Sequence, residues 1–375
     1  MKILFCSGIF PPAIGGPGTV LTKLIPALIE RGYICSVATF GPGDNISRSY
    51  AVHRVSLSKS QPGRFLAVLG QIWRLAGQHD AIYATDTYTH GLTSLVVAKL
   101  RGKPFILRFT GDAAWESAFN QGLTQDYIVD FQGKWYGPKA AFRKWLRKLI
   151  LQGADKIITD CEFLKNLVKI IGVDNSKVTV INNVSEQLPL AEETKNFGEH
   201  VLLTQARLVP WKGMAAIIDA LPAIQKQFPD AKLLIMGDGP EEERLKLIVN
   251  SKGLIDKVIF LGKVTDKKTK KSIYEASHIF ILNTFYEGMS NTLPEAAAEG
   301  LPIITTRAGG NPEFVDENNG RLVEYNNVEQ ITAAAIELFS SPEKAKQLGD
   351  NGKKRAQQYT LENLVNKNIA LLKSL

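Results

Sequence analysis

Short runs of β-branched and apolar residues alternate with longer segments of helical periodicity along the first half of the chain. An apolar run of four to eight residues is typical of a buried strand, whereas apolar positions three and four apart indicate a helix. Strands that alternate with helices usually form a parallel sheet covered by helices. The strands expected here are residues 2–7, 34–39, 81–84, 105–109, 156–159 and 178–181.

A polar and acidic stretch at residues 185–199 follows neither period, and it is interpreted as an interdomain linker. The alternation then resumes. The sequence therefore predicts an α/β protein of two doubly wound, Rossmann-like lobes, residues 1–186 and 187–358, with residues 359–375 as a final helix that can return to the first lobe. The strands expected in the second lobe are residues 201–204, 232–236, 258–261, 279–282 and 303–305.

Length and composition agree with two globular lobes. A chain of 375 residues is longer than a domain with a single hydrophobic core normally is. The chain is 45% hydrophobic and 22% charged, and no apolar run approaches the roughly 20 residues of a bilayer-crossing helix. Its apolar start is too short for a signal peptide and fits a first strand better. Three scattered cysteines, Cys6, Cys35 and Cys161, suggest neither a metal site nor disulfides, so a cytoplasmic location is expected.

Charge is distributed unevenly between the two halves. The net charge is +8; residues 1–186 contain 22 Lys and Arg against 13 Asp and Glu, whereas residues 187–375 contain 23 against 24. The whole excess therefore belongs to the first lobe. It indicates an anionic partner such as a phosphorylated acceptor or an acidic membrane surface, with solubility alone as the other interpretation.

Two cations follow the first strand of the second lobe. Arg207 and Lys212 lie on the segment ARLVPWKG at 206–213, which leads from a strand into a helix. Cations five residues apart on such a loop can converge on one diphosphate, and both stay charged near neutral pH. A lone cation there is usually solvated, but the flanking Pro, Trp and Gly that shape the loop favour binding.

Two further loops of this lobe are weaker candidates. The strand at 232–236 ends in Gly237-Asp238-Gly239-Pro240, where glycines allow a tight turn and Pro suits a first helical turn. After the strand at 258–261, the main chain at Lys263 and Val264 can pair with a nucleobase edge. Taken alone, each segment is only a turn.

The strongest signal is the segment EGMSNTLPE between Glu287 and Glu295, which leads into a helix. Its two carboxylates can address different parts of one ligand, and the unpaired amides at 290–293 can face an anion, as amides at helix N-termini do. The alternative for Glu295 is a first-turn residue that complements the helix dipole.

These loops resemble the donor site of family 4 retaining glycosyltransferases, the glycosyl transferases group 1, which have the GT-B fold. The resemblance rests on Arg207 with Lys212, on the loop from Glu287 to Glu295, and on GGNPE at 309–313. The glycine-rich segment at 12–18 is similar to the family's opening loop, so the resemblance covers essentially the whole chain. It implies two lobes that face each other across a cleft.

The resemblance also implies a role for each matching residue. Arg207 and Lys212 would neutralise the donor diphosphate, Glu287 would lie beside the transferred sugar, and Glu295 would bind ribose hydroxyls. Gly15 and Gly16 would let the first-lobe loop approach the phosphates. The catalytic residues would then be Glu287, Arg207 and Lys212, and backbone groups would come from Gly237, Lys263, Val264, Gly288, Met289, Ser290, Asn291 and Thr292.

The expected reaction moves a hexose from a UDP- or GDP-sugar to a lipid-linked or glycan acceptor, in the synthesis of cell-envelope polysaccharide or glycolipid. No Asp-x-Asp motif occurs in the sequence, so neither a metal nor another cofactor is expected. The two cations would stabilise the leaving diphosphate in its place. No nucleic-acid partner is expected.

The acceptor side departs from the family pattern. Members often carry a histidine after the strand equivalent to 105–109, where this chain has Arg108-Phe109-Thr110-Gly111-Asp112, and none of its five histidines falls there. Thr110, Asp112 and Asp86 are the candidate acceptor-binding residues, because each lies on a loop past a strand. For the two aspartates, a helix cap or a turn is an equally good interpretation.

The segment from Lys134 to Lys148 contains six cations, four aromatic residues and no acid. Helical spacing places Phe142, Trp145 and Leu149 on one side. Such a helix can lie in an anionic membrane interface, or it can pack its apolar side on the core with a solvated basic face. The basic first lobe favours peripheral contact with the inner face of the cell membrane.

Three other functions compete with glycosyl transfer. A nicotinamide-dependent oxidoreductase shares the Rossmann-like lobes, but the first strand is followed by Gly15-Gly16-Pro17-Gly18 and not by the G-x-G-x-x-G order. A nucleotide-sugar epimerase of the same build would have a similar donor site. A non-enzymatic sensor would not need both the cation pair and the glutamates.

Overall fold

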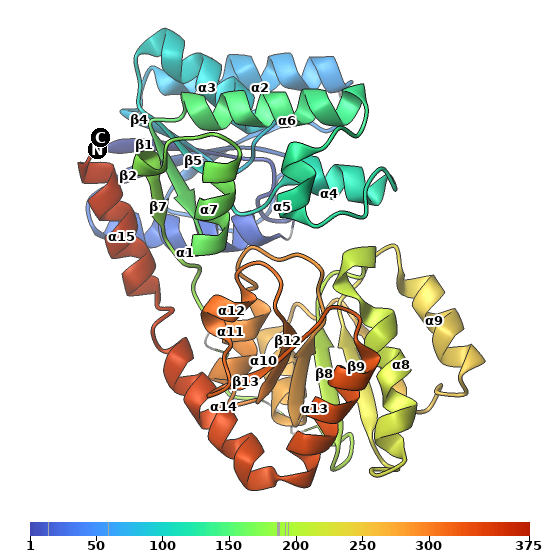
Figure 1. The fold of residues 1–375 in the computed structure, drawn as a ribbon. Coiled ribbons are helices and arrows are strands. Elements are labelled where there is room, and N and C mark those ends of the chain that lie inside the picture. Colours follow the sequence, from blue (N-terminus) through green and yellow to red (C-terminus); the bar gives the residue numbers. More distant parts are fainter. Residues whose placement is uncertain (14, 59, 186–187, 192, 194) are drawn as a thin grey trace. The chain divides into compact units, whose positions relative to one another are not determined.

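The computed structural model describes residues 1–375 except 14, 59, 186–187, 192 and 194. The chain divides into two compact units, residues 1–183 with 361–375, and residues 184–360 (Figure 1). The divisions lie close to the predicted boundaries at 186 and 358. Part of the predicted linker, including residues 186, 187, 192 and 194, lies outside the described residues.

The first unit contains a parallel sheet in the order β3-β2-β1-β4-β5-β6-β7. Helices cover both faces, as parallel sheets require, so β1, β4, β5 and β6 are largely buried, whereas the edge strands β3 and β7 are only partly buried. β3 joins the edge of the sheet and was not expected from the sequence, because its residues AVHRV alternate weakly. The strands are β1 Lys2–Ser7, β2 Ile34–Phe40, β3 Ala51–Val55, β4 Ala81–Ala84, β5 Phe105–Arg108, β6 Lys156–Thr159 and β7 Val178–Val180.

The helices of this unit form two layers (Figure 1). α2 (Gln61–Ala76), α3 (Thr89–Arg101) and α6 (Pro138–Gly153) lie on one face of the sheet, and α3 contacts both of the others. α1 (Gly16–Glu30), α7 (Glu162–Ile170) and α15 (Leu361–Lys373) lie on the other face. The short helices α4 (Ala113–Asn120) and α5 (Ile128–Gly133) contact α6 and α7, respectively.

The last helix, α15, belongs to the first unit although residues 184–360 separate it from the rest of that unit in sequence. It packs on α1. Its Leu364, Val365, Leu371 and Leu372 are buried. Within the core, the Tyr83 hydroxyl donates a hydrogen bond to Asn368 Oδ1 over 3.4 Å. Burial of this apolar stripe accounts for the return of the chain end to the first sheet.

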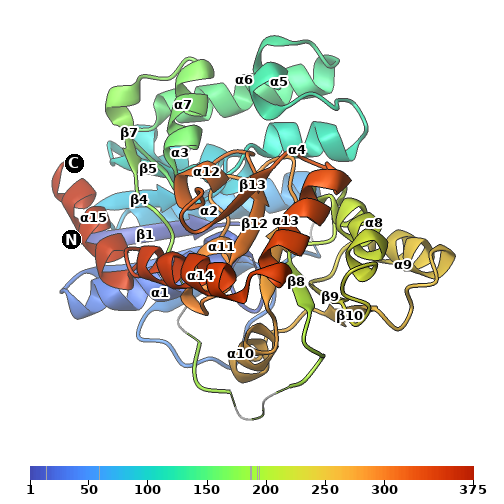
Figure 2. The same ribbon diagram turned by 60° about the horizontal axis from the view of Figure 1, so that its bottom comes forward.

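The second unit has a parallel sheet in the order β10-β9-β8-β11-β12-β13. α8 packs beside α9 and against α13, and α14 packs on α11 (Figure 2). The strands are β8 Val201–Gln205, β9 Lys232–Met236, β10 Val258–Gly262, β11 Ile279–Leu282, β12 Ile303–Thr306 and β13 Gly320–Val323. The helices are α8 Met214–Gln225, α9 Glu242–Ser251, α10 Lys267–Glu275, α11 Thr292–Ala298, α12 Asn311–Phe314, α13 Val328–Ser340 and α14 Pro342–Ala356.

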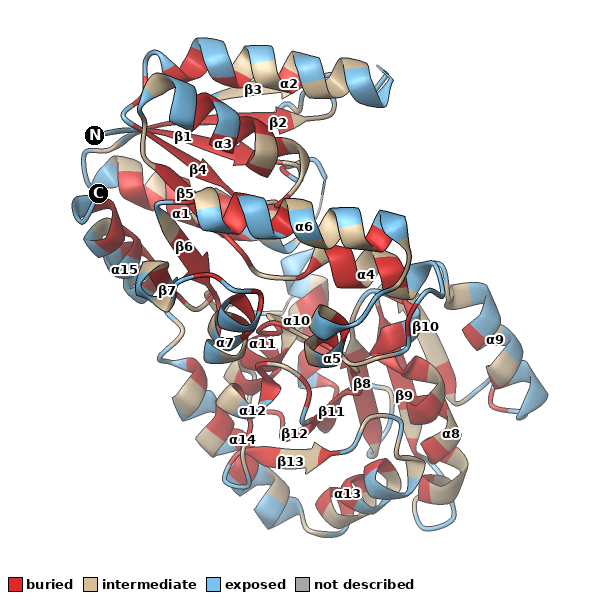
Figure 3. Ribbon diagram, turned by 45° about the horizontal axis from the view of Figure 1, so that its top comes forward, coloured by how far each residue is buried: buried red, intermediate tan, exposed pale blue. Residues whose placement is uncertain are grey.

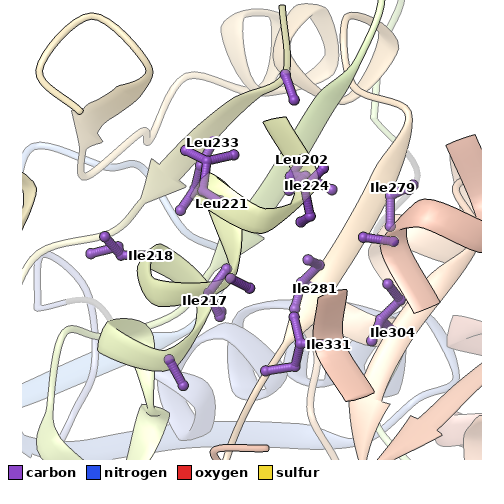
Figure 4. Packing of buried hydrophobic residues seen from close by; sticks show 14 of the residues in the cluster. Leu202, Ile217, Ile218, Leu221, Ile224, Leu233, Ile279, Ile281, Ile304 and Ile331 are labelled. Atoms are coloured by element: carbon purple, nitrogen blue, oxygen red, sulfur yellow. The ribbon is translucent and has the colours of Figure 1, made fainter. Parts of the chain in front are cut away.

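The core of the second unit lies between the sheet and the helices α8 and α13 (Figure 4). Alternate residues of the strands point toward the helices, whose apolar faces fill the layer. The close-up shows Leu202, Leu233, Ile279, Ile281 and Ile304 from the strands with Ile217, Ile218, Leu221, Ile224 and Ile331 from the helices. This packing fixes the sheet from which the site loops extend.

Both sheets reverse their strand order beside the first strand of the unit. The reversal lies between β1 and β4 in one sheet and between β8 and β11 in the other. In open parallel sheets, ligands bind past the carboxyl ends of the strands at such a switch point. Among the described residues, no helix is long and apolar enough to cross a membrane.

Candidate active site

The candidate residues of the second unit lie on loops that follow β8, β9, β10, β11 and β12. All of these strands are parallel, so their carboxyl ends share one edge of the sheet. Arg207 and Lys212 follow β8, and Glu287 follows β11, so they flank the switch point of this sheet. The architecture thus brings together residues that are 75 positions apart.

The loop after β8 is shaped by a turn that presents Lys212. Residues Pro210–Lys212 form a short 3₁₀ helix, which ends at Gly213 with φ +51°. A Cβ on Gly213 would lie 2.3 Å from Asn283 Nδ2, which donates to the Gly213 carbonyl over 2.8 Å. Glycine is therefore required at this position, both for the left-handed backbone and for the close approach of Asn283.

Lys212 and Glu287 form an ion pair across the switch point. Lys212 is buried and Glu287 is half-buried. Arg207 is exposed, with its guanidinium 5.5 Å from the centre of the Trp211 ring. In water-poor surroundings, a cation and a carboxylate this close neutralise each other.

A second loop with two glycines, Gly309 and Gly310, packs against the backbone of Glu287 and Gly288. Gly309 has φ +57°, and a Cβ there would lie 1.7 Å from the Glu287 carbonyl oxygen. The Gly310 amide donates to the Gly288 carbonyl over 2.8 Å. The GGNPE segment, which the sequence connected to the site only through a family resemblance, therefore contacts the backbone that carries Glu287.

The segment between Glu287 and α11 is compact and mostly buried. Gly288, Met289 and Ser290 are buried, and the hydroxyls of Ser290 and Thr292 lie 2.9 Å apart. The buried Oδ1 of Asn291 has no hydrogen-bond partner in the described part of the chain. These residues lie between the two glutamates, where the sequence expected backbone contacts with the donor.

Glu295 is in the first turn of α11, and it accepts a hydrogen bond from Lys270 Nζ on α10 over 2.6 Å. Both side chains are buried. The sequence did not identify Lys270, because nothing local distinguishes it from the neighbouring Lys267, Lys268 and Lys271. Lys270 is distinguished only by the tertiary structure, which places its side chain, on α10, beside Glu295 on α11.

The loops after β8 and β9 are joined by backbone contacts. The Leu208 amide donates to the Asp238 carbonyl over 2.8 Å, and a Cβ on Gly237 would lie 1.9 Å from the Ala206 carbonyl oxygen. Lys263 is exposed and Val264 half-buried past β10. β9 separates β10 from β8, which corresponds to about 10 Å at the usual strand spacing. A nucleotide spans such a distance.

In the first unit, Asp86 lies at the switch point between β1 and β4. Its carboxylate accepts hydrogen bonds from the amides of Gly8 (3.0 Å), Tyr88 (3.2 Å) and His90 (3.1 Å), and His90 Nδ1 lies 3.2 Å from Oδ2. Burial by itself would raise the pKa of Asp86, but the His90 contact and the backbone amides outweigh it and hold this pKa below the usual value. Of the two interpretations that the sequence left open for Asp86, the structure favours the residue that shapes a turn.

Asp112 is the N-cap of α4 and is completely buried. Oδ1 accepts from the Ala114 amide over 3.0 Å, and Oδ2 accepts from Gln132 over 3.0 Å and from Arg147 of α6. Both oxygens are therefore occupied by protein groups, and the cap is the interpretation that the structure favours. An acceptor hydroxyl would have to replace one of these partners. Thr110, which is half-buried, remains the more accessible candidate on this loop.

The remaining sequence candidates lie at the start of α1. Gly15 is the N-cap and Gly16 is the first residue of that helix. A Cβ on Gly15 would lie 3.0 Å from Ile9 Cγ2, so the glycine permits a close approach to the residues that follow β1. Residue 14 of the same loop lies outside the described residues. In the part of the chain that is described, no cluster of three or more His, Cys, Asp or Glu could hold a metal ion.

Two Rossmann-like units, with charged loops gathered at the switch point of the second, are the arrangement expected of a GT-B glycosyltransferase. Residues 186–355 match the family Glycosyl transferases group 1, and residues 14–184 match Glycosyltransferase Family 4. The chain belongs to this glycosyltransferase family. The oxidoreductase and epimerase alternatives gain no support from these matches.

Curated relatives and solved structures agree with this assignment. A GDP-mannose-dependent alpha-(1-6)-phosphatidylinositol monomannoside mannosyltransferase of Mycobacterium tuberculosis is 31% identical over 299 residues, 77% of this chain and 68% of the relative. A glycosyltransferase of Haemophilus influenzae is 25% identical over 361 residues, 94% of each chain. Anabaena HepE, solved in complex with UDP and glucose, aligns over 100% of both chains with a TM-score of 0.79 and 18% identity, which shows a common fold.

Proposed function

We propose that this glycosyltransferase moves a hexose from a UDP- or GDP-sugar to a lipid-linked or glycan acceptor, with retention of the anomeric configuration. The observation that carries the proposal is the convergence of Lys212 and Glu287 at the switch point of the second unit, with Arg207 on the same loop as Lys212. A cation pair suits a diphosphate, and a carboxylate beside it suits the hydroxyls of a sugar.

In the proposed reaction, the bond between the anomeric carbon and the diphosphate oxygen breaks, and negative charge develops on the departing diphosphate. Arg207 and Lys212 stabilise that charge, which is the step in which fixed cations contribute most. Glu287, released from Lys212 by the phosphate, accepts hydrogen bonds from the sugar and holds it beside the leaving group.

Retention follows if the acceptor oxygen attacks the same face from which the diphosphate leaves. The acceptor proton then passes to the departing phosphate oxygen, so that no protein nucleophile is needed. The cations perform the charge neutralisation that a metal performs in other transferases. We therefore expect turnover to continue in the presence of EDTA and the product to keep the anomeric configuration of the donor, as measured by NMR.

The relatives indicate two donor bases and do not select one of them. The mycobacterial relative is described as dependent on GDP-mannose, and the Anabaena protein was solved with UDP and glucose. A thermal-shift screen of UDP, GDP and their sugars separates the two, because a bound ligand raises the melting temperature by mass action. No shift with any nucleotide would contradict the proposal.

A second measurement tests the reaction class. Release of nucleoside diphosphate that depends on an added acceptor indicates transfer, whereas an epimerase would interconvert the sugar of the donor without acceptor. Glu287→Gln should lower acceptor-dependent release by up to about 10²–10³. Glu317→Gln, on a loop after α12, serves as the control and should leave it unchanged. Equal release by both variants would remove the proposed role of Glu287.

For the acceptor, we propose a lipid-linked glycan presented at the cytoplasmic face of an anionic membrane, within cell-envelope polysaccharide or glycolipid synthesis. The support comes from the three helices on one face of the first sheet. α2, α3 and α6 contain no acidic residue, and nine cations: Arg64, Arg74, Lys99, Arg101, Lys139, Arg143, Lys144, Arg147 and Lys148. Two of these point inward, since Arg147 pairs with Asp112 and Lys144 donates to main-chain carbonyls.

Exposed residues recur along the same three helices (Figure 3), and several of them are large and apolar. Phe142 and Trp145 of α6 are 59% and 55% exposed, with ring centres 5.7 Å apart, and Leu100 of α3 is 70% exposed. Trp73 of α2 stacks under Arg101 of α3 at 4.1 Å. The sequence offered a helix that packs its apolar side on the core as one interpretation of this segment. α6 differs from that interpretation, because its aromatic side chains Phe142 and Trp145 lie on the surface. Basic helices with exposed aromatic residues suit an anionic lipid interface.

Flotation with liposomes tests this surface. We expect the protein to float with vesicles that contain anionic lipid at low salt and to be released at high salt. Phe142→Ser combined with Trp145→Ser should weaken flotation, whereas Leu247→Ser on α9 of the second unit, also an exposed apolar residue, should not. Absence of flotation at low salt would remove the membrane from the proposal.

A further inference from the structure

Two lysines of α10 form ion pairs with two glutamates, one within α11 and one at its C-terminal end. The two pairs differ in the other groups that they contact. Lys270 Nζ lies 2.6 Å from Glu295 Oε2, and Lys271 pairs with Glu299. Glu295 and Glu299 are one helical turn apart, so the two pairs lie side by side. Lys271 also reaches Glu275 on its own helix over 3.3 Å, whereas Lys270 is directed to the carboxylate expected to bind ribose.

Lys270 is held in place on several sides. Its Nζ lies 5.9 Å from the centre of the Tyr274 ring, and the Tyr274 hydroxyl donates to Gln205 Oε1 over 2.6 Å. Gln205 is the last residue of β8, two positions before Arg207. Asp266 caps α10 by accepting from the Thr269 amide over 2.7 Å. These contacts connect the end of β8 with Lys270 and Glu295.

A buried ion pair is an expensive way to join two helices. The cost of removing both charges from water usually matches or exceeds their attraction, and an apolar pair of similar size serves stability as well or better. α10 and α11 are already joined by Lys271 and Glu299. Lys270 is 8% exposed and Glu295 9% exposed, so the pair carries a desolvation cost that stability does not require.

We propose that Lys270 is a positioning residue for the ribose of the nucleotide donor. By bonding to one oxygen of Glu295, it holds this carboxylate in one orientation, so that the carboxylate accepts from the 2′ and 3′ hydroxyls. Lys270 itself touches no part of the donor. This inference rests on the proposed function, because it assigns a ligand group to Glu295.

Affinity for a nucleotide with and without ribose hydroxyls provides the test. Calorimetry would compare UDP or GDP, whichever the wild-type protein binds, with its 2′,3′-dideoxy form. Lys270→Met should weaken binding of the ribonucleotide about tenfold, the usual scale for a lost charged hydrogen bond, and leave the affinity for the dideoxy form unchanged. The KM for the donor should rise by a similar factor while kcat stays about the same.

Two variants serve as controls. Lys271→Met removes the neighbouring pair and should change neither affinity, and Lys270→Arg should restore most of the ribonucleotide affinity. If Lys270→Met does not fold, as judged by its melting temperature, Lys270→Gln replaces it in the same comparison. Equal weakening of both nucleotides, or no weakening of either, would overturn the positioning role and leave Lys270 as a link between two helices.

The outcomes distinguish this inference from the proposed function. If the wild-type protein binds no nucleotide, the proposed function fails. If the wild-type protein prefers the ribonucleotide and Lys270→Met keeps the same preference, only the role of Lys270 fails.

Discussion

The two Rossmann-like units place charge at corresponding points of similar sheets but use it differently. At the switch point of the second unit, Lys212 and Glu287 pair with each other, and under the proposed function a donor would replace this pairing. In the first unit, Asp86 accepts hydrogen bonds from three backbone amides. Asp112, which follows β5, is buried and forms an ion pair with Arg147. Charge thus serves loop architecture in the first unit, and in the second unit it serves donor binding under the proposed function.

The largest effect on stability is expected from the buried pair of the first unit. Asp112 is 0% exposed, and Arg147→Met leaves its carboxylate buried without a cation. The free energy of unfolding should therefore fall by about 3–5 kcal/mol. Urea denaturation measures the change. The double variant Asp112→Asn with Arg147→Met removes the unpaired charge and should recover part of the loss. Equal stability of Arg147→Met and the wild type would show that Asp112 is not a structural charge.

The largest effect on catalysis is expected at Glu287. Glu287→Ala should lower kcat by about 10²–10³, the scale for loss of one preorganised electrostatic contact. The melting temperature should also fall, because the buried Lys212 loses its partner. Steady-state kinetics with saturating donor measure the change. An Ala variant with wild-type kinetics would remove the distinction drawn between the two units.

Gly309→Ala tests whether the Glu287 loop depends on its backing glycine. The added Cβ would lie 1.7 Å from the Glu287 carbonyl at a positive φ, so the loop must shift, with an expected loss of about 1–3 kcal/mol and reduced kcat. Gly300→Ala is the matched control, because its φ is also positive but nothing lies within 4 Å of the added carbon. Similar loss of activity in both variants would mean that strain alone, and not the contact with Glu287, is responsible.

The smallest effect is expected from a surface pair of the second unit. Hydrogen bonding from Arg321 and the nearby Lys344 lower the pKa of Glu337 from 4.5 to about 2. A lowered pKa in the folded state means that this pair contributes stability above about pH 4.5 and loses the contribution as the pH falls toward 2. Glu337→Gln should therefore cost less than about 1 kcal/mol at pH 7 and nothing near pH 2. Denaturation of both proteins across this range checks it; a constant difference would contradict the assignment.

Much of the fold could be predicted from local patterns. The alternation of short apolar runs with helical periodicity predicted the strands at 2–7, 81–84 and 201–204, because buried parallel strands are continuously apolar. β3 was missed, since the edge strand Ala51–Val55 includes His53 and Arg54 and is only half-buried. Edge strands carry less of the apolar signal on which such a prediction depends.

The candidate site could be predicted only in part. Arg207, Lys212 and the loop from Glu287 to Glu295 were apparent from residue types at strand ends. Lys270 was not apparent, because its partner Glu295 is 25 positions away on another helix. The ambiguity of Asp112 had the same origin, since Arg147 is 35 positions away.

The sequence by itself determined the two α/β units, the loops that carry charge and the basic character of the first unit, because these follow from short-range periodicity and residue type. Only the tertiary structure decided which charges meet. The order of strands places β8 beside β11, and therefore Lys212 beside Glu287, and the packing of α10 on α11 places Lys270 on Glu295. Ion pairs between distant loops depend on sheet order and helix packing, which no local pattern contains.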